Sequence, residues 1–252
     1  MPEVIFRFYE ELNDFLPARR RKRDFQVDFK GRESVKDMIE ALGVPHTEVD
    51  LVLVNGKSVD FGCIIQDKDR ISVYPLFESL DIRDVTRLRE IPLRQTRFIA
   101  DIYIRDIVKY MRAMGLDVYY DTSLSPREII RISKRENRTI LTKSRKLLKF
   151  RDVTHGIFIR PGTTVEQIRG IIDYLSLRGV MEPFSKCLQC NKFLVRVSKE
   201  RILDRIPPKT REFCDEYSYC KACDRIYWKG THYMKIKKVV DEILGSFEVR
   251  LP

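Results

Sequence analysis

The sequence predicts a multidomain α/β protein, and three observations along its 252 residues support that prediction. Residues 1–79 order their elements as strand, strand, helix, strand, strand, which is the order of a β-grasp, ubiquitin-like domain. Residues 97–182 alternate short strands with helices, a spacing that requires crossover connections and a parallel sheet. Residues 183–235 hold two Cys-x-x-Cys pairs in a segment too short for a large apolar core, so we expect a metal to stabilise it. Residues 80–96 are predicted to be an arginine-rich linker, and residues 236–252 a C-terminal tail.

The β-grasp prediction depends on short apolar runs and on local signals for caps and turns. Strands are expected at residues 2–9, 24–30, 49–54 and 71–74. Ser34 is a suitable N-cap for a short helix that Gly43 ends. Asn55-Gly56 is a strong signal for a hairpin turn, and Cys63 is expected in the core of this domain.

The central domain is predicted from alternating strand and helix periodicity. Strands are expected at residues 98–101, 118–120, 139–142 and 156–159, and helices at 104–111, 126–136 and 164–177. A short basic helix is also expected at residues 234–245.

Charge is distributed unevenly along the chain. Residues 1–80 hold 12 basic and 15 acidic side chains, whereas residues 81–150 hold 17 and 9, and residues 151–252 hold 19 and 13. The excess of basic side chains in residues 81–252 favours a polyanionic partner such as nucleic acid. The alternative is a solvated surface with no partner. No apolar run is long enough to span a membrane, and the N-terminus lacks the order of a signal peptide, so we expect a soluble, cytoplasmic protein.

Cys187, Cys190, Cys220 and Cys223 form the two cysteine pairs, which are 29 residues apart. In a cytosolic chain such pairs indicate a metal site more than disulfides; the alternative is free thiols or a redox site. Two thiolates on each of two turns complete a tetrahedral zinc site, and four thiolates leave no position for water or substrate. The expected zinc is therefore structural. Cys214 and His232 could substitute as ligands but lack the paired spacing.

Asp101 and Glu128 are the candidate catalytic residues. Asp101 follows the first central strand, where open parallel sheets place their sites, and a carboxylate there can hold Mg²⁺ or Mn²⁺ beside a phosphodiester. Its alternative role is a cap, or an ion pair with Arg105 four residues on. Glu128 fits a capping box with Ser125, and for this residue we favour the structural role over metal binding.

The stretch Tyr227-Trp228-Lys229-Gly230-Thr231-His232-Tyr233 interleaves aromatic and basic side chains directly after the second cysteine pair. Such interleaving suits base stacking and phosphate contact. The alternative is that Tyr227 and Trp228 pack on the cysteine turn as a small core, and the two roles can coexist.

Taken together, these segments resemble the Mut-seven C-terminal domain family, a PIN-like ribonuclease fold joined to a zinc ribbon. The matching motifs are Phe98-Ile-Ala-Asp101, Met111-Arg-Ala-Met-Gly-Leu-Asp117, Ile140-Leu-Thr142, Thr154-His-Gly156, Cys187-Leu-Gln-Cys-Asn191 and Tyr227-Trp-Lys-Gly-Thr-His232. The front, with Val54-Asn-Gly-Lys57 and Val73-Tyr-Pro-Leu-Phe-Glu-Ser79, resembles the ubiquitin-like domain that often precedes this family. Residues 97–182 are thus expected to be PIN-like and residues 183–235 a zinc ribbon.

The resemblance implies a metal-dependent RNA hydrolase whose acids cluster at strand ends. Asp101 matches the first of these acids, but Ser125 and Pro126 stand where the family has an acidic pair, and Ser144 stands where it has aspartate. Ubiquitin-like modifiers act through a free terminal Gly-Gly, whereas this chain continues through Leu80. The front domain is therefore expected to be an interaction module with a protein partner.

Our leading interpretation is an RNA-binding protein on a degenerate PIN-like ribonuclease scaffold, acting on structured RNA such as ribosomal or transfer RNA. The expected RNA contacts are Arg105, Lys143, Arg145, Lys146, Trp228, Lys229 and His232. The first alternative is an active ribonuclease dependent on Mg²⁺ or Mn²⁺, in which Glu128, Asp106 or Asp152 replaces the missing acids. The second alternative is a protein-binding adaptor.

Overall fold

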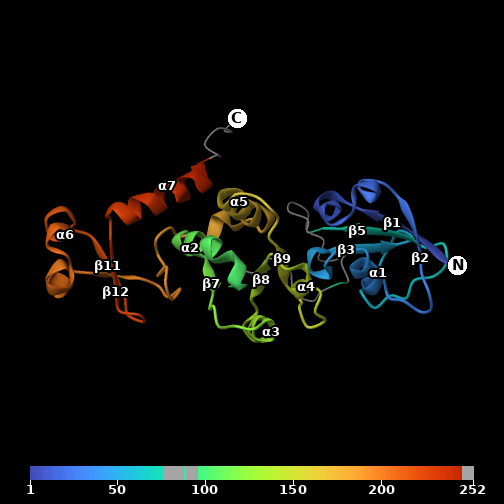
Figure 1. Ribbon diagram of the computed structural model, residues 1–252, viewed down its shortest axis with the longest axis horizontal. Coiled ribbons are helices and arrows are strands. Elements are labelled where there is room, and N and C mark those ends of the chain that lie inside the picture. The colour runs from blue at the N-terminus through green and yellow to red at the C-terminus, as the bar shows by residue number, and fades with distance from the viewer. Residues whose placement is uncertain (76–87, 89–95, 246–252) are drawn as a thin grey trace. The chain divides into compact units, whose positions relative to one another are not determined.

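The structure is a computed structural model that describes residues 1–75, Leu88 and residues 96–245. A β-rich region comes first along the chain and an α/β region with parallel strands follows (Figure 1). A region with a cysteine cluster comes last, so the predicted fold class is confirmed. Apart from Leu88 and Thr96, the predicted linker lies outside the described residues, as does the predicted tail beyond Gly245. Among the described helices, none combines the length and the apolar character that a membrane crossing requires.

The chain divides into two compact units, which are described separately below. The first unit comprises Met1–Gln95 and Ser125–Ile159, and the second comprises Thr96–Leu124 and Arg160–Pro252. The domain limits expected from the sequence stay predictions.

The first unit contains the predicted β-grasp fold. Its elements are β1 (Glu3–Phe8), β2 (Phe25–Asp28), α1 (Val35–Ala41), β3 (Leu51–Val54), β4 (Lys57–Ser58) and β5 (Arg70–Tyr74). Within residues 1–75 the strands form one sheet in the order β2-β1-β5-β3-β4, with β1 and β5 parallel. The Ser34 hydroxyl accepts a hydrogen bond from the Asp37 N–H, which confirms the predicted cap. Asn55 and Gly56 take φ values of 50° and 80°, the left-handed pair that a tight two-residue hairpin turn requires.

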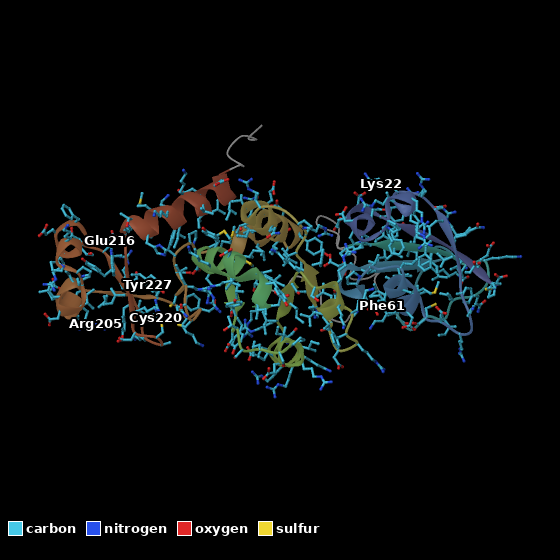
Figure 2. All side chains as sticks on the ribbon, in the orientation of Figure 1. Lys22, Phe61, Arg205, Glu216, Cys220 and Tyr227 are labelled. Carbon is cyan, nitrogen blue, oxygen red and sulfur yellow. The ribbon has the colours of Figure 1, made fainter. Side chains whose placement is uncertain are left out.

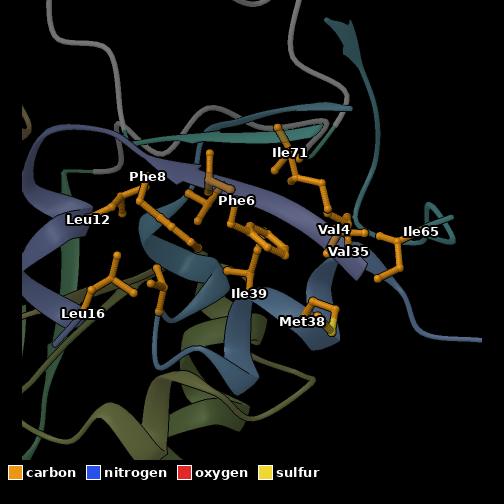
Figure 3. Close-up of a cluster of buried hydrophobic side chains, with 14 of the residues drawn as sticks. Val4, Phe6, Phe8, Leu12, Leu16, Val35, Met38, Ile39, Ile65 and Ile71 are labelled. Carbon is orange, nitrogen blue, oxygen red and sulfur yellow. The ribbon is translucent and has the colours of Figure 1, made fainter. Parts of the chain in front are cut away.

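The core of the β-grasp fold lies between its sheet and α1 (Figure 3). Val4, Phe6 and Phe8 on alternate positions of β1 are almost completely buried, as period-2 alternation predicts. Cys63 is half-buried and packs against this core as expected, and burial is the main cause that raises the pKa of its thiol. The connection from β1 to β2 contains the 3-10 helix Glu10–Phe15, which inserts Leu12 into the core.

The rest of the first unit is α/β. It comprises α3 (Pro126–Glu136), β8 (Thr139–Thr142), α4 (Arg145–Leu148) and β9 (Gly156–Phe158), and β8 and β9 are parallel. The predicted helix and strands are confirmed. The short helix α4 was missed, because a single turn is too short to show helical periodicity.

The second unit begins with β6 (Arg97–Ala100), α2 (Arg105–Ala113) and β7 (Asp117–Tyr119), and β6 and β7 are parallel. Gly115 ends α2 at a φ of 86°, and a Cβ at this position would collide with the backbone of Glu182. Glycine therefore permits both the turn and the close passage of the later chain. The predicted later helix appears as α5 (Thr164–Tyr174).

The cysteine-rich segment folds around a small antiparallel sheet, termed the ribbon sheet. The ribbon sheet consists of β10 (Val195–Val197), β11 (Tyr217–Cys220) and β12 (Arg225–Trp228), in the order β10-β11-β12. The short helix α6 (Pro208–Phe213) lies between β10 and β11 in the sequence. The helix α7 (Thr231–Gly245) follows the ribbon sheet directly and begins three residues earlier than the predicted start at 234. This helix packs against α2 and α5, where the Arg169 side chain donates to the carbonyls of Glu242 and Ile243.

Candidate metal centre and nucleic-acid interface

The two cysteine pairs adopt the same local turn. In the first turn the Asn191 N–H donates to the Cys187 carbonyl at 3.0 Å, and in the second the Asp224 N–H donates to the Cys220 carbonyl at 2.9 Å. Asn191 and Asp224 both have left-handed backbone conformations, with φ values of 65° and 59°. Asn and Asp tolerate this conformation better than other non-glycine residues. Each Cys-x-x-Cys motif is thus followed by the residue type that closes its turn.

The turns bring four sulfur atoms together. All four Sγ atoms lie within 4.8 Å of one another, with Cys187 and Cys223 3.5 Å apart and Cys190 and Cys220 3.3 Å apart. Zinc at about 2.3 Å from four sulfurs places them about 3.8 Å apart in a tetrahedron, so the donor set and spacing fit. The four cysteines could therefore hold a metal ion such as zinc. Cys214 is outside this group and packs against the small ribbon core instead.

Hydrogen bonds around the sulfurs favour charge on Cys187. Burial opposes ionisation, but donors from Tyr227 and from the backbone of Cys190 and Gln189 outweigh it and lower the pKa of Cys187 to about 6. The Tyr227 hydroxyl lies 3.0 Å from the Cys187 sulfur, on the strand next to the one that ends at Cys220 (Figure 2). Burial and the neighbouring thiols raise the pKa of Cys223 to about 12. A bound cation would favour the thiolate form of all four cysteines.

Arg112 joins the first cysteine turn to the α/β part of the second unit. Its buried guanidinium donates to the carbonyls of Leu188 and Gln189 at 3.0 and 2.7 Å, and to the carbonyl of Val118 at 2.8 and 3.0 Å. Asn191 adds a second link, because its side chain accepts from the Val118 N–H and donates to Asp117. Burial lowers the pKa of Arg112, and the negative charge of nearby thiolates opposes this shift.

A cavity of about 1560 Å³ opens between α2, the ribbon sheet and the start of α7, all within the second unit. Four of the predicted RNA contacts line it together, namely Arg105, Trp228, Lys229 and His232. Among the described residues its wall carries seven lysines or arginines against three acids, and six aromatic side chains. A basic wall interleaved with aromatic rings is suited to phosphates and stacked bases.

The cations of the cavity wall differ in what they contact. Lys229 forms an ion pair with Glu216 at 2.6 Å, and Arg112 is held by backbone carbonyls. Within the described part of the chain, Arg105, Arg196 and Arg225 are exposed and form no ion pair. These three side chains have the freedom to meet an external anion.

Arg196 and Arg225 were not among the residues predicted to contact RNA. A signal for Arg196 does exist, because it lies between two valines in an alternating strand and must point away from them.

Trp228 has the packing role that the sequence left open and also lines the cavity, while its contact with RNA stays a prediction. It packs against the small ribbon core of Ile202, Ile206 and Tyr217, and it also lines the cavity. Gly230 permits this position, since a Cβ there would lie 2.8 Å from the Trp228 indole nitrogen.

Lys143, Arg145 and Lys146 lie in the first unit, around α4. All three are exposed, but the Arg145 guanidinium lies 5.0 Å from the Phe15 ring centre and 5.1 Å from that of Phe158. Arg145 therefore has a structural contact already, and RNA contact by these three residues stays a prediction.

Asp101 and Glu128 both act as caps. Asp101 is 4 % exposed, and its Oδ1 accepts from the Tyr103 N–H at 2.9 Å at the start of a 3-10 turn. Glu128 completes the predicted capping box, with its Oε2 accepting from the Ser125 N–H at 2.8 Å and from the Ser125 hydroxyl at 2.7 Å. Their catalytic roles stay predictions.

Comparison with known families agrees with this layout. Residues 96–240 match the model of the Mut7-C RNAse domain, and residues 1–81 match that of the Mut7-C ubiquitin domain. No curated protein and no solved structure gives a significant match. Because the first match alone covers more than half of the 252 residues and includes both cysteine pairs, the chain belongs to the Mut7-C RNAse domain family, with a Mut7-C ubiquitin domain at its front.

Proposed function

We propose that this protein binds RNA in the cavity between α2, the ribbon sheet and α7, and that it cleaves RNA weakly or not at all. The observation that carries the proposal is the basic and aromatic wall of that cavity. Because the chain belongs to an RNAse domain family, RNA is the polyanion that we propose for this cavity. Structured RNA such as ribosomal or transfer RNA is the proposed class of partner, because it offers both phosphates and unstacked bases in its loops.

Weak cleavage follows from the residues that replace the family's acids. Ser125 caps α3, and Ser144 caps α4 by accepting from the Leu147 N–H at 3.3 Å. A hydroxyl supplies the cap but not the negative charge that a divalent cation needs. Phosphodiester hydrolysis with two metal ions requires several carboxylates, and Asp101 supplies one.

The second candidate function is an active metal-dependent ribonuclease. It is favoured by Asp101, a buried carboxylate just past the end of β6, which is where parallel sheets place catalytic groups. In this case Asp101 and Asp106, which both lie in the second unit, would contribute to holding Mg²⁺ or Mn²⁺.

Binding is tested with fluorescently labelled RNAs and two triple variants of the full chain. The cavity variant carries Arg105→Ala, Arg196→Ala and Arg225→Ala, and the control variant carries Lys30→Ala, Arg32→Ala and Lys57→Ala, which remove equal charge from the β-grasp surface. We expect the cavity variant to weaken binding at least about tenfold for all sequences, because phosphate contacts carry no sequence information. Equal binding by both variants would contradict the proposed site, and no binding by the natural protein at low salt would favour the adaptor.

Cleavage is tested on the same RNAs with Mg²⁺ and with Mn²⁺, beside Asp101→Asn. Strong cleavage that Asp101→Asn abolishes would establish the ribonuclease instead. Ser144→Asp should raise Mn²⁺ affinity without loss of stability, because aspartate caps a helix as well as serine does. Ser144→Asn is its matched control, since asparagine caps without adding charge.

A further inference from the structure

Within the first unit, the strand β9 contacts the β-grasp fold. The contact is made by the edge of β9 that faces away from β8. β9 is the last strand of its sheet, and the Ile159 N–H that follows it donates to the Thr142 carbonyl at the end of β8. The Phe158 N–H, which alternation directs to the other side, donates to the Glu48 carboxylate at 2.6 Å. Unpaired groups along an edge strand invite pairing with other chains. Glu48 removes that risk at this position.

The neighbouring side chain His46 makes a second polar contact from the same 3-10 turn, His46–Glu48. Its Nδ1 lies 2.6 Å from the Glu40 Oε1 of α1, and its Nε2 lies 2.7 Å from the Val153 carbonyl. Each ring nitrogen of His46 therefore lies within hydrogen-bond distance of an oxygen, one from α1 and one from Val153. Lys149 adds a contact from the other side, donating to the Glu40 carbonyl at 2.6 Å.

Aromatic side chains complete the contact. The rings of Phe15 and Phe158 lie 5.4 Å apart, and Phe158 packs against the β-grasp core. The Arg145 guanidinium covers both rings. Apolar packing therefore lies beside the buried polar groups.

We propose that the partner of the ubiquitin-like domain is its own chain, and that the domain is a permanent edge cap for residues 145–158. His46 and Glu48 are 4 % and 1 % exposed, and a polar group buried this far costs free energy unless it is paired. For both side chains a pairing group comes from residues 153–158. Because these two side chains are buried against residues 153–158, this face of the domain is not available to a foreign partner. The proposal does not depend on RNA binding.

The test is hydrogen exchange on the full chain, with Glu48→Ala compared against Glu48→Gln. Alanine removes the acceptor for the Phe158 N–H, whereas glutamine keeps an oxygen in its place. We expect amides of residues 145–158 to exchange at least about tenfold faster in Glu48→Ala, and to stay close to the natural rate in Glu48→Gln. Asp28→Asn is a matched control, because Asp28 is an exposed acid on β2.

A reciprocal variant guards against simple unfolding of the β-grasp fold. Lys149→Ala changes only the other side of the contact, and it should speed exchange at residues 40–49 while the amides of β1 stay protected. Unchanged exchange at residues 145–158 in a folded Glu48→Ala protein would overturn the proposal. Exchange that slows only when another protein is added would overturn it also, in favour of a foreign partner.

Discussion

At the scale of single residues, Arg112 links the first cysteine turn to the α/β part of the second unit through four hydrogen bonds. It is buried in α2, yet two of its hydrogen bonds go to carbonyls inside the first cysteine turn and two to β7. Its positive charge also lies near the thiolates of Cys187 and Cys190. A tetrathiolate zinc centre carries a net negative charge, so a buried cation beside it favours metal binding.

Replacing Arg112 with methionine should therefore weaken both folding and metal retention. The change leaves three carbonyls without their donor, and we expect a loss of about 3 kcal/mol in the free energy of unfolding. Zinc release to a chelator should become at least about tenfold faster. Denaturant unfolding and a colorimetric zinc assay measure the two effects. Arg105→Met on the exposed face of the same helix is the control, and equal zinc release from both variants would contradict this role.

At the scale of elements, the ribbon sheet has a core too small to hold it alone. Its cluster of buried hydrophobic residues among the described residues is Ile202, Ile206 and Tyr217, with Trp228 partly buried against them. A core of this size supplies little of the free energy that ordering the segment costs. A metal ion held by the four cysteines would add to the stability of this segment.

Removal of the metal should unfold the ribbon sheet and leave the β-grasp fold intact. Trp228 is the single tryptophan of the chain, so its fluorescence reports on this segment alone. We expect a red shift of its emission when a strong chelator is added, while amides of β1 stay protected from exchange. Cys214→Ser should behave like the natural protein, because Cys214 lies outside the cysteine group, whereas Cys220→Ser should show the shift without chelator.

The elements also show which features a sequence can predict. Helix α3 was predicted with its bounds and its capping box, because Ser125, Pro126 and Glu128 are local signals that act within one turn. The cysteine group was predictable for a similar reason, since each pair closes its own turn. The cavity could be predicted only in part, because Arg196 and Arg225 join Arg105 through tertiary packing that no local pattern records. RNA contact by Arg145 stays a prediction, and its contact with the rings of Phe15 and Phe158 could not be predicted because the two rings are far apart in sequence.

At the scale of the whole molecule, the charge asymmetry makes a prediction about salt. The natural protein has a net charge of +11, with the excess beyond residue 80. Each phosphate contact to single-stranded RNA adds about 0.7 to the steepness with which affinity falls with salt on a double-logarithmic plot. The cavity variant lacks three such contacts, so its slope should be shallower by about 2. Binding titrations between low and physiological salt measure this, and a slope that matches the control variant would place the RNA elsewhere.

The contact of Glu48 with the Phe158 N–H joins residues 110 positions apart, and that of His46 with Val153 joins residues 107 apart. During synthesis the β-grasp segment leaves the ribosome before β9 does, and domains fold in order as they emerge. Its acceptors are then already in place when β9 is made. The nascent α/β segment meets a folded surface at the moment when its edge strand is most exposed to aggregation. If the ubiquitin-like domain caps this edge as proposed, we expect it to act as a chaperone in cis for β9.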